Sequence, residues 1–199
     1  MSGVTTIDLI RHGEPVGGRA YRGHGVDDPL SDRGWAQMRA AVADAAPWQA
    51  VISSPLLRCR AFAEELARRH RLPLAVDERF KEVGFGTWEG RTAERIRAEH
   101  PDQWAAFQDD PVRGRPPGAE PLDAFVGRVS DALEEAAARH AGERLLVVAH
   151  AGVIRAAVVH AVGAPLAAMY RMRITNAGFA TLTREAGRWT LHRLNAPSP

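Results

Sequence analysis

An arginine and a histidine, Arg11 and His12, stand side by side near the start of the chain, after an apolar-leaning run from residue 4 to residue 10. A guanidinium group binds phosphate or carboxylate oxygens through paired hydrogen bonds, and a neutral imidazole acts as a nucleophile. Gly13, the next residue, leaves room for a ligand close to the backbone. In isolation the stretch fits two interpretations: a site that holds and attacks an anion, or a strand end with two solvated polar residues.

Three more side chains of similar chemistry occur farther along the chain, namely Arg58, Glu82 and His150. A second arginine and a second histidine add donors for an anion, and a carboxyl group moves a proton to or from a reacting oxygen. Taken one at a time, each also fits an ordinary structural explanation: a solvated arginine, a solvated loop carboxylate, or a structural histidine that ends an apolar strand. Their joint role depends on the elements that carry them.

Two predicted strands place candidate residues at their carboxyl ends. Residues 4–10 form one strand, which ends beside Arg11 and His12, and residues 144–149, apolar on both faces, form a buried parallel strand that ends at His150. The carboxyl ends of strands are where open α/β sheets bind their ligands. The two histidines are therefore expected at the same edge of the sheet.

Arg58 belongs to a predicted helix that begins directly after a short buried strand at residues 50–53. Ser54 is predicted to cap this helix, and Pro55 to stand in its first turn. A helix N-terminus favours anions through its free N–H groups, and an arginine in the first turn strengthens such a site. A solvated arginine fits the same position equally well.

Glu82 lies in residues 77–90, whose glycines and aromatic residues predict an ordered loop. Two short helical patterns follow, at residues 92–99 and 102–108. Because this block interrupts the alternation of strands and helices, we predict an insertion at about residues 91–118 that covers the site as a lid.

The remaining pattern completes an α/β domain. The other predicted elements are a loop at residues 16–29, helices beginning at Ser31 and spanning residues 122–140, and strands at residues 74–76, 171–175, 179–183 and 189–194. We expect a single domain over residues 1–199, with a three-layer α/β/α architecture around a mostly parallel central sheet.

The composition of the chain limits its class and its partners. Its 199 residues are 45% hydrophobic and 25% charged, which suits one domain with a full core. The apolar runs are far shorter than the roughly 20 residues of a membrane span, and the start lacks a secretory pattern, so we expect a cytoplasmic protein without a membrane partner. A formal net charge of +2 without a basic and aromatic stripe argues against nucleic acid. The single cysteine, Cys59, excludes an intramolecular disulfide and a thiolate metal cluster. The sequence does not predict the oligomeric state.

Four stretches in order resemble the motifs of the histidine phosphatase superfamily, in its phosphoglycerate mutase-like branch. They are Arg11-His12-Gly13-Glu14, residues 53–58 (SSPLLR), residues 81–90 (KEVGFGTWEG) and residues 149–155 (AHAGVIR). The resemblance extends from about residue 5 to residue 183. Any one motif occurs by chance, but four in the same order are specific.

Within that family, the motif residues are most similar to those of the small α-ribazole phosphatase-like proteins. The similarity lies in Trp88-Glu89-Gly90 and in His150-Ala151-Gly152-Val153-Ile154-Arg155. The chain is also shorter than typical phosphoglycerate mutases. It departs from the family at residues 21–30, which are longer than usual, and at residues 116–121, where alanine and proline replace glycine and serine. Both departures lie where the leaving group of a substrate would be recognised, so the resemblance does not carry over a substrate.

The resemblance implies a role for each of the five candidate residues. His12 would attack phosphorus as a neutral imidazole and form a phosphohistidine, and neighbouring arginines favour that neutral form. Arg11, Arg58 and His150 would hold the phosphoryl oxygens during transfer. Glu82 would protonate the leaving oxygen and later accept a proton from water. These positive groups supply the charge that Mg²⁺ supplies in other phosphatases, so no metal and no cofactor are expected.

The resemblance therefore implies a metal-independent phosphomonoesterase that acts on a small phosphorylated metabolite, with α-ribazole phosphate as one candidate. Two alternatives stay open: a cofactor-dependent phosphoglycerate mutase, and a non-catalytic module that binds anions or proteins on the same scaffold. Four further residues are candidate contacts for the rest of the substrate, namely Arg22, His24, Arg113 and Arg115.

Overall fold

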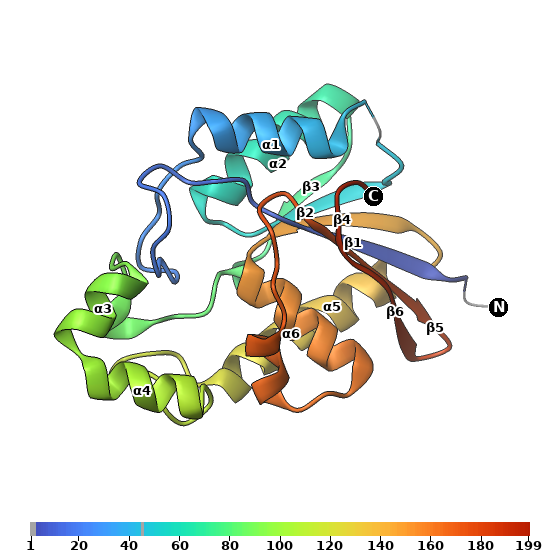
Figure 1. The fold of residues 1–199 in the computed structure, drawn as a ribbon. Helices are drawn as coiled ribbons and strands as arrows, with labels where there is room; N and C mark the ends of the chain where they lie inside the picture. Colours follow the sequence, from blue (N-terminus) through green and yellow to red (C-terminus); the bar gives the residue numbers. More distant parts are fainter. Residues whose placement is uncertain (1–2, 45) are drawn as a thin grey trace.

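A twisted six-stranded sheet forms the middle layer of the computed structural model, which describes residues 3–44 and 46–199 (Figure 1). The domain predicted over residues 1–199 thus includes residues 1, 2 and 45, which lie outside the described residues. The strands are β1 (Thr5–Arg11), β2 (Ala50–Ser53), β3 (Leu74–Val76), β4 (Arg144–Ala149), β5 (Phe179–Glu185) and β6 (Arg188–Ala196). They lie in the order β3-β2-β4-β1-β5-β6. Strands β1 to β4 pair in parallel. Strand β5 pairs antiparallel with β1 and with β6, so the sheet is mostly parallel, as predicted.

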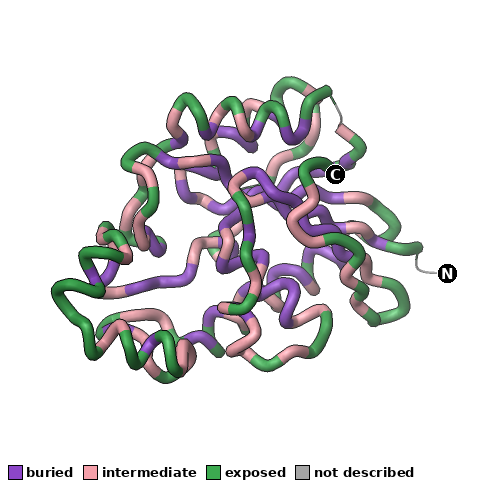
Figure 2. The backbone as a smooth tube through the Cα atoms, in the orientation of Figure 1, coloured by how far each residue is buried: buried purple, intermediate pink, exposed green. Residues whose placement is uncertain are grey.

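Helices cover both faces of this sheet and complete the predicted three layers. On one face lie α1 (Asp32–Val42) and α2 (Leu57–His70), and on the other lie α5 (Leu122–Arg139) and α6 (Ala151–Val162) (Figure 1). The central strand β4 is enclosed between these layers, and its residues from Leu145 to Ala149 are 0% exposed. Figure 2 shows this buried centre and the exposed outer faces of the helices. Removal of so much apolar surface from water is the main favourable term for this fold.

The predicted cap of α1 is confirmed. The Ser31 hydroxyl accepts a hydrogen bond from the backbone N–H of Gly34 at 3.0 Å, and α1 begins at Asp32. A capping hydroxyl satisfies one of the free N–H groups of a helix start and contributes about 1 kcal/mol. Met38 and Val42 then point into the core, as their spacing predicts.

The predicted start of α2 is wrong by two residues, since Ser54 is not its cap. The helix begins at Leu57, with Leu56 as a cap that offers no side-chain hydrogen bond. Ser54 is instead held against β4, since its N–H donates to the carbonyl of Val148 at 3.0 Å. Its hydroxyl lies 2.7 Å from Nε2 of His150 and accepts the N–H of Leu56 at 3.3 Å, so this serine joins the sheet edge to the residue that precedes the helix.

The strand predicted at residues 171–175 is also wrong. Leu166–Arg171 is a 3₁₀ helix (η3), and residues 172–178 form no strand before β5 begins. Three carbonyls of this segment accept hydrogen bonds from side chains: Met172 from Arg155, Arg173 from Asn195, and Ile174 from Arg11. These side chains replace the neighbouring strand that an alternating pattern normally requires.

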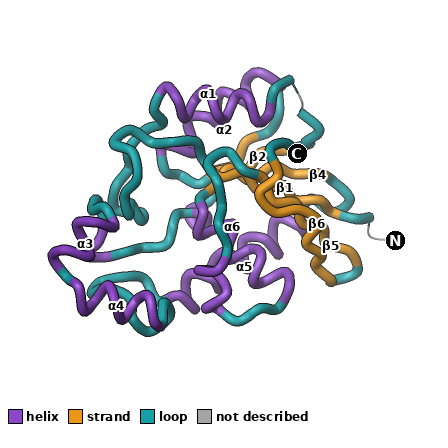
Figure 3. Tube along the Cα trace, in the orientation of Figure 1, coloured by secondary structure: helices purple, strands orange, loops and turns teal. Residues whose placement is uncertain are grey.

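The two short helices predicted after the Glu82 loop are confirmed as α3 (Ala93–Glu99) and α4 (Pro101–Asp109), which lie away from the sheet (Figure 3). They join the domain through an aromatic cluster in which Trp88 packs edge-on against Tyr21 and Phe107. Trp104 completes this packing. Among the described residues, each helix is too short or too polar to span a bilayer.

Candidate active site

The two histidines predicted to share a sheet edge lie next to each other. β1 and β4 are paired in register with Arg11 opposite Ala149, so His12 and His150 follow adjacent strand ends. Their ring centroids are 5.2 Å apart and the ring planes cross at 66°. Both side chains are buried. Arg11, His12, Arg58 and His150 together are called the anion cluster below.

His12 is held as a neutral imidazole with one nitrogen free. Its Nδ1 lies 2.7 Å from the carbonyl oxygen of Gly13; a carbonyl only accepts, so Nδ1 carries the proton and Nε2 keeps a lone pair. Burial first, and then the positive charges of Arg58 and Arg11, lower the pKa of His12 well below its ordinary value. The amide of Asn176 donates to the backbone carbonyl of His12 at 3.1 Å. This arrangement is that of a positioned nucleophile.

The half-buried Arg11 and the buried Arg58 flank the histidines without a close carboxylate. Arg58 donates through Nη1 to Val26 and through Nη2 to Gly23, both at 2.9 Å, and Arg11 donates through Nη1 to Ile174 at 2.6 Å. In both arginines the buried Nε has no hydrogen-bond partner. The nearest carboxylate of Arg58, that of Asp27, is 4.0 Å away.

This cluster favours an anionic ligand. A buried donor without a partner costs about 1–3 kcal/mol, and a phosphoryl oxygen would satisfy it. Burial also lowers the pKa of Arg11 to about 10, although the charge of Glu82 opposes that shift. The guanidinium therefore still carries its charge near neutral pH.

His150 completes the cluster from the end of β4. Its Nε2 lies 2.7 Å from the hydroxyl of Ser54, and the thiol of Cys59 lies 3.5 Å from the same nitrogen. Burial, followed by the charges of Arg58 and His12, lowers its pKa well below the ordinary value. Ser54 thus orients the ring of His150. The sequence predicts a different role for this serine, as the cap of α2.

Glu82 reaches the start of α6 from its loop. One carboxylate oxygen accepts the N–H of Val83 at 3.0 Å, and the other accepts the N–H of Gly152 at 3.3 Å. A Cβ atom at residue 152 would lie 2.2 Å from Glu82 Oε1, so only glycine permits this approach. The glycine two residues after His150 therefore brings the carboxylate to the anion cluster.

The loop that carries Glu82 is held by an ion pair that sequence reasoning missed. Arg128, in the middle of α5, donates to the carbonyls of Lys81 and Glu82 at 2.9 and 3.3 Å and pairs with Glu120 at 2.7 Å. Glu120 in turn accepts the N–H of Gly84 at 3.1 Å. The spacing of α5 gives no sign of this role, because the two loop carbonyls lie 47 and 46 residues earlier in the chain.

Two candidate substrate contacts lie close to the cluster. Arg22 is buried, bonds Asp28 at 2.8 Å and the carbonyl of Val16 at 2.7 Å, and braces the loop at residues 16–29. Its charge contributes to the lowered pKa of His12. His24 is exposed, and its Nδ1 lies 3.2 Å from the carbonyl oxygen of Glu82.

The other two candidate contacts serve different surroundings. The three donor nitrogens of Arg115 bond Glu120, Tyr170 and Gly84, at 2.9, 2.7 and 2.8 Å, so this arginine joins the Glu82 loop to η3. Arg113 is 90% exposed and faces Asp110. Among the described residues, no hydrogen bond or ion pair joins Arg113 to the anion cluster.

Gly13 differs from its interpretation in the sequence. The space beside Gly13 is occupied by the carbonyl of Gly34, which a Cβ atom at residue 13 would meet at 2.2 Å. This glycine therefore lets α1 approach the sheet edge and does not leave room for a ligand. The carboxylate of Glu14 lies 3.6 Å from Arg33 on α1.

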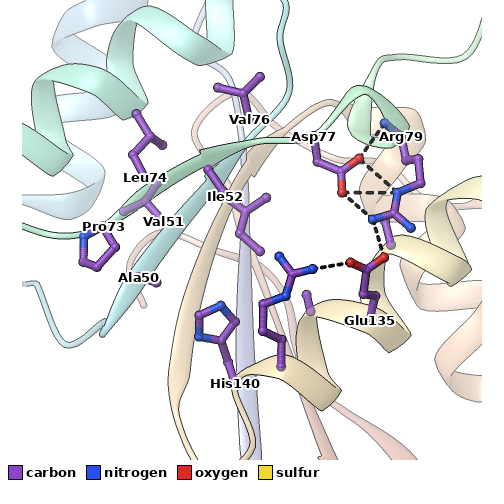
Figure 4. Close-up of a pocket in the computed structure, with 14 residues that line it drawn as sticks. Ala50, Val51, Ile52, Pro73, Leu74, Val76, Asp77, Arg79, Glu135 and His140 are labelled. Atoms are coloured by element: carbon purple, nitrogen blue, oxygen red, sulfur yellow. Dashed lines mark hydrogen bonds and ion pairs between the residues drawn. The ribbon is translucent and has the colours of Figure 1, made fainter.

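A separate hollow of about 200 Å³ lies at the other end of the molecule, between the edge strand β3, β2 and α5 (Figure 4). Its walls include Ile52 and Leu74, and its rim carries Asp77, Arg79 and Glu135. The rim charges are paired with one another, since Arg79 contacts both carboxylates. None of the predicted site residues lines this hollow.

Comparison with known proteins agrees with this geometry. The model of the histidine phosphatase superfamily (branch 1) matches residues 7–197. Phosphoserine phosphatase 1 of Hydrogenobacter thermophilus is 28% identical over 94% of this chain and 90% of its own length. Adenosylcobalamin/alpha-ribazole phosphatase of Salmonella typhimurium is 28% identical over 94% of this chain and 95% of its own. Among solved structures, mycobacterial glucosyl-3-phosphoglycerate phosphatase superposes with a TM-score of 0.85 at 27% identity, over 97% of this chain and 99% of that one.

Proposed function

The chain belongs to the histidine phosphatase superfamily, and from that premise we propose that it is a metal-independent phosphomonoesterase that works through a phosphohistidine on His12. The observation that carries the proposal is the anion cluster: a neutral histidine with a free Nε2 lies beside two arginines whose buried Nε atoms lack partners. Such donors stabilise the negative charge that the phosphoryl oxygens carry during transfer.

The first half of the reaction transfers the phosphoryl group to the enzyme. The lone pair of His12 Nε2 attacks phosphorus, and the bond from phosphorus to the leaving oxygen breaks. Glu82, in its protonated form, gives its proton to that oxygen, and the alcohol departs. Arg11, Arg58 and His150 hold the three remaining phosphoryl oxygens.

The second half returns the enzyme to its starting state. Glu82, now a carboxylate, accepts a proton from a water molecule as the water oxygen attacks phosphorus. The bond from phosphorus to Nε2 breaks, inorganic phosphate leaves, and His12 is again neutral. Burial and the nearby arginine charges, which keep the pKa of His12 low, favour this release.

The names of the relatives supply the first substrates for a test. One relative is named for phosphoserine and another for adenosylcobalamin and α-ribazole, and they are equally identical to this chain. A panel should therefore contain phosphoserine, α-ribazole 5′-phosphate and p-nitrophenyl phosphate, with and without a chelator. We expect hydrolysis that survives chelation; activity that is lost to chelator and restored by a divalent metal would overturn the mechanism.

Labelling identifies the nucleophile. Rapid quench with a ³²P-labelled substrate should trap an acid-labile phosphoprotein in the wild type, and His12→Ala should abolish both the label and turnover. Retained labelling in His12→Ala would refute the assignment of His12. A mutase is tested separately with 3-phosphoglycerate and bisphosphoglycerate: faster release of 2-phosphoglycerate than of inorganic phosphate would favour the isomerase.

A further inference from the structure

A third arginine, Arg155, lies beside the anion cluster and plays no part in the steps above. It stands on α6, one turn after the glycine that contacts Glu82, and its Nε donates to the carbonyl of Met172 at 2.9 Å. Arg11 donates to the carbonyl of Ile174, two residues farther along the same segment. Carbonyls two residues apart in extended chain are separated by about 7 Å, so the two guanidinium groups are neighbours.

The charge of Glu82 acts on Arg11 without forming an ion pair with it. Among the described residues, no ion pair joins a carboxylate to Arg155 or to Arg11, although many exposed arginines of this chain have such partners. The charge of Arg155 contributes to the lowered pKa of Arg11, after burial. Two positive groups held close together without a paired carboxylate favour a ligand with more than one negative group.

Arg155 lies on the side where the alcohol portion of a substrate would sit. Its Cζ is 5.9 Å from the ring centroid of Tyr170. The charge of Glu82 acts on Tyr170, and the charge of Arg155 acts on the phenol of Tyr21, which places all four side chains in one neighbourhood. Because Glu82 is the proposed donor to the leaving oxygen, we place the leaving alcohol on this side, beside Tyr170 and Arg155.

We propose that Arg155 binds a carboxylate carried by the alcohol portion of the substrate, which makes this enzyme selective for phosphate esters of small hydroxy acids. The proposal rests on the function proposed above. With its Nε on Met172, Arg155 keeps its Nη groups for a planar carboxylate, whose two oxygens match the guanidinium plane. Arg11 and Arg58 remain with the phosphoryl group.

A matched pair of substrates tests this selectivity. 3-Phosphoglycerate and glycerol 3-phosphate have the same carbon chain and differ in a carboxylate against a hydroxymethyl group. The wild type should have the higher kcat/KM for 3-phosphoglycerate. Arg155→Gln should lower that value about 10- to 100-fold, chiefly through KM, as expected for a lost charge-assisted contact, and should leave glycerol 3-phosphate nearly unchanged. Arg60→Gln, on the exposed side of α2, is the matched control and should keep the wild-type ratio.

The possible outcomes separate the two proposals. Equal losses on both substrates in Arg155→Gln, or no preference in the wild type, would overturn the carboxylate contact while the phosphatase assignment stands. Hydrolysis of neither ester, with no label on His12, would count against the proposed function. The contact is then measured by calorimetry as binding of 3-phosphoglycerate to His12→Ala, with and without Arg155→Gln. Equal affinity in those two variants would also overturn it.

Discussion

The arginines of the anion cluster and those around the edge hollow have opposite surroundings. In the cluster, Arg11 and Arg58 are tied to backbone carbonyls, and each has a buried Nε without a partner. At the hollow, Arg79 bonds the carboxylates of Asp77 and Glu135, and Arg139 also pairs with Glu135 (Figure 4). Arg11 and Arg58 keep a net positive charge, whereas carboxylates of the same chain neutralise the charges of Arg79 and Arg139.

This difference in surroundings indicates that the arginines of the cluster contribute to ligand binding and those at the hollow to the stability of the fold. A carbonyl fixes the direction of a guanidinium group but does not cancel its net charge, so the group retains a strong attraction for an anion. A carboxylate partner both fixes and neutralises it, and such a partly exposed pair contributes at most about 1 kcal/mol to the fold. Substitutions in the two regions should therefore affect different measurements.

The largest contrast is expected between Arg58→Gln and Arg79→Gln. Arg58→Gln should lower kcat/KM about 10²- to 10³-fold, because a preorganised charged donor to the phosphoryl oxygens is lost. Arg79→Gln should keep kcat/KM near the wild-type value and lower the free energy of unfolding by about 0.5–1 kcal/mol. Steady-state kinetics and urea unfolding measure both quantities. Similar losses of activity in the two variants would remove the distinction between the regions.

Glu82→Gln should produce the next largest effect, and one that depends on the substrate. Loss of the proposed acid should slow hydrolysis of alkyl phosphates about 10²-fold or more, since their leaving oxygens need a proton. p-Nitrophenyl phosphate has a good leaving group and should lose far less. The ratio of the two kcat values measures the effect, and an equal loss on both substrates would exclude Glu82 as the acid.

Arg128→Gln should give a weaker form of the same substrate dependence. Arg128 contacts the carbonyls of the Glu82 loop, so its loss should misplace the acid and lower kcat for alkyl phosphates about 10-fold. Arg184→Gln is the matched control, because Arg184 forms a similar ion pair with Glu134 away from this loop. A uniform loss for alkyl and aryl phosphates would indicate a general structural role for Arg128.

The strand ends could be predicted from the sequence because local patterns encode them. Residues 144–149 are apolar on both faces, which predicts a buried strand, and Ser31 stands directly before the helix that it caps. The start of α2 could not be predicted in this way, since Ser54 is held by Val148 and His150, more than 90 residues away. A serine followed by proline has the pattern of a helix start, and only the folded chain shows that β4 binds this serine instead.

The site was predictable only in part, for a similar reason. The five candidate residues come together at one sheet edge, whereas Arg128 and Asn176 act through contacts between distant segments. Arg155 belongs to the motif at residues 149–155, but its contact with Met172 does not show in the sequence. The segment at residues 171–175 shows the limit clearly. Its alternating pattern predicts a strand, but side chains from β1 and α6 occupy its carbonyls.

The smallest predicted effect concerns the pH dependence of stability. The folded pKa of His12 lies well below its ordinary value of 6.5 because of burial, so the unfolded chain binds more protons as the pH falls below about 6.5. The stabilisation is fully present above that pH and decreases toward the folded pKa. His12→Gln should make the fall in unfolding free energy between pH 6.5 and 5 shallower, by up to about 1.4 kcal/mol per pH unit.

Urea unfolding at several pH values measures that slope. His192→Gln, at an exposed position on β6, controls for the loss of one histidine. An unchanged slope in His12→Gln would contradict a neutral, buried His12, and with it the contrast between charged arginines and uncharged histidines in the cluster.

Arg11 and Arg155 both donate hydrogen bonds to the segment from Met172 to Ile174. This segment therefore affects both catalytic power and substrate range. Any insertion or backbone change there would displace the guanidinium proposed for the phosphoryl group together with the one proposed for the leaving alcohol. Substrate range and catalytic power should therefore show strong epistasis in this segment. Library designs for new substrates would do better to vary Tyr21 and Tyr170, whose side chains do not anchor Arg11, and to leave residues 172–174 unchanged.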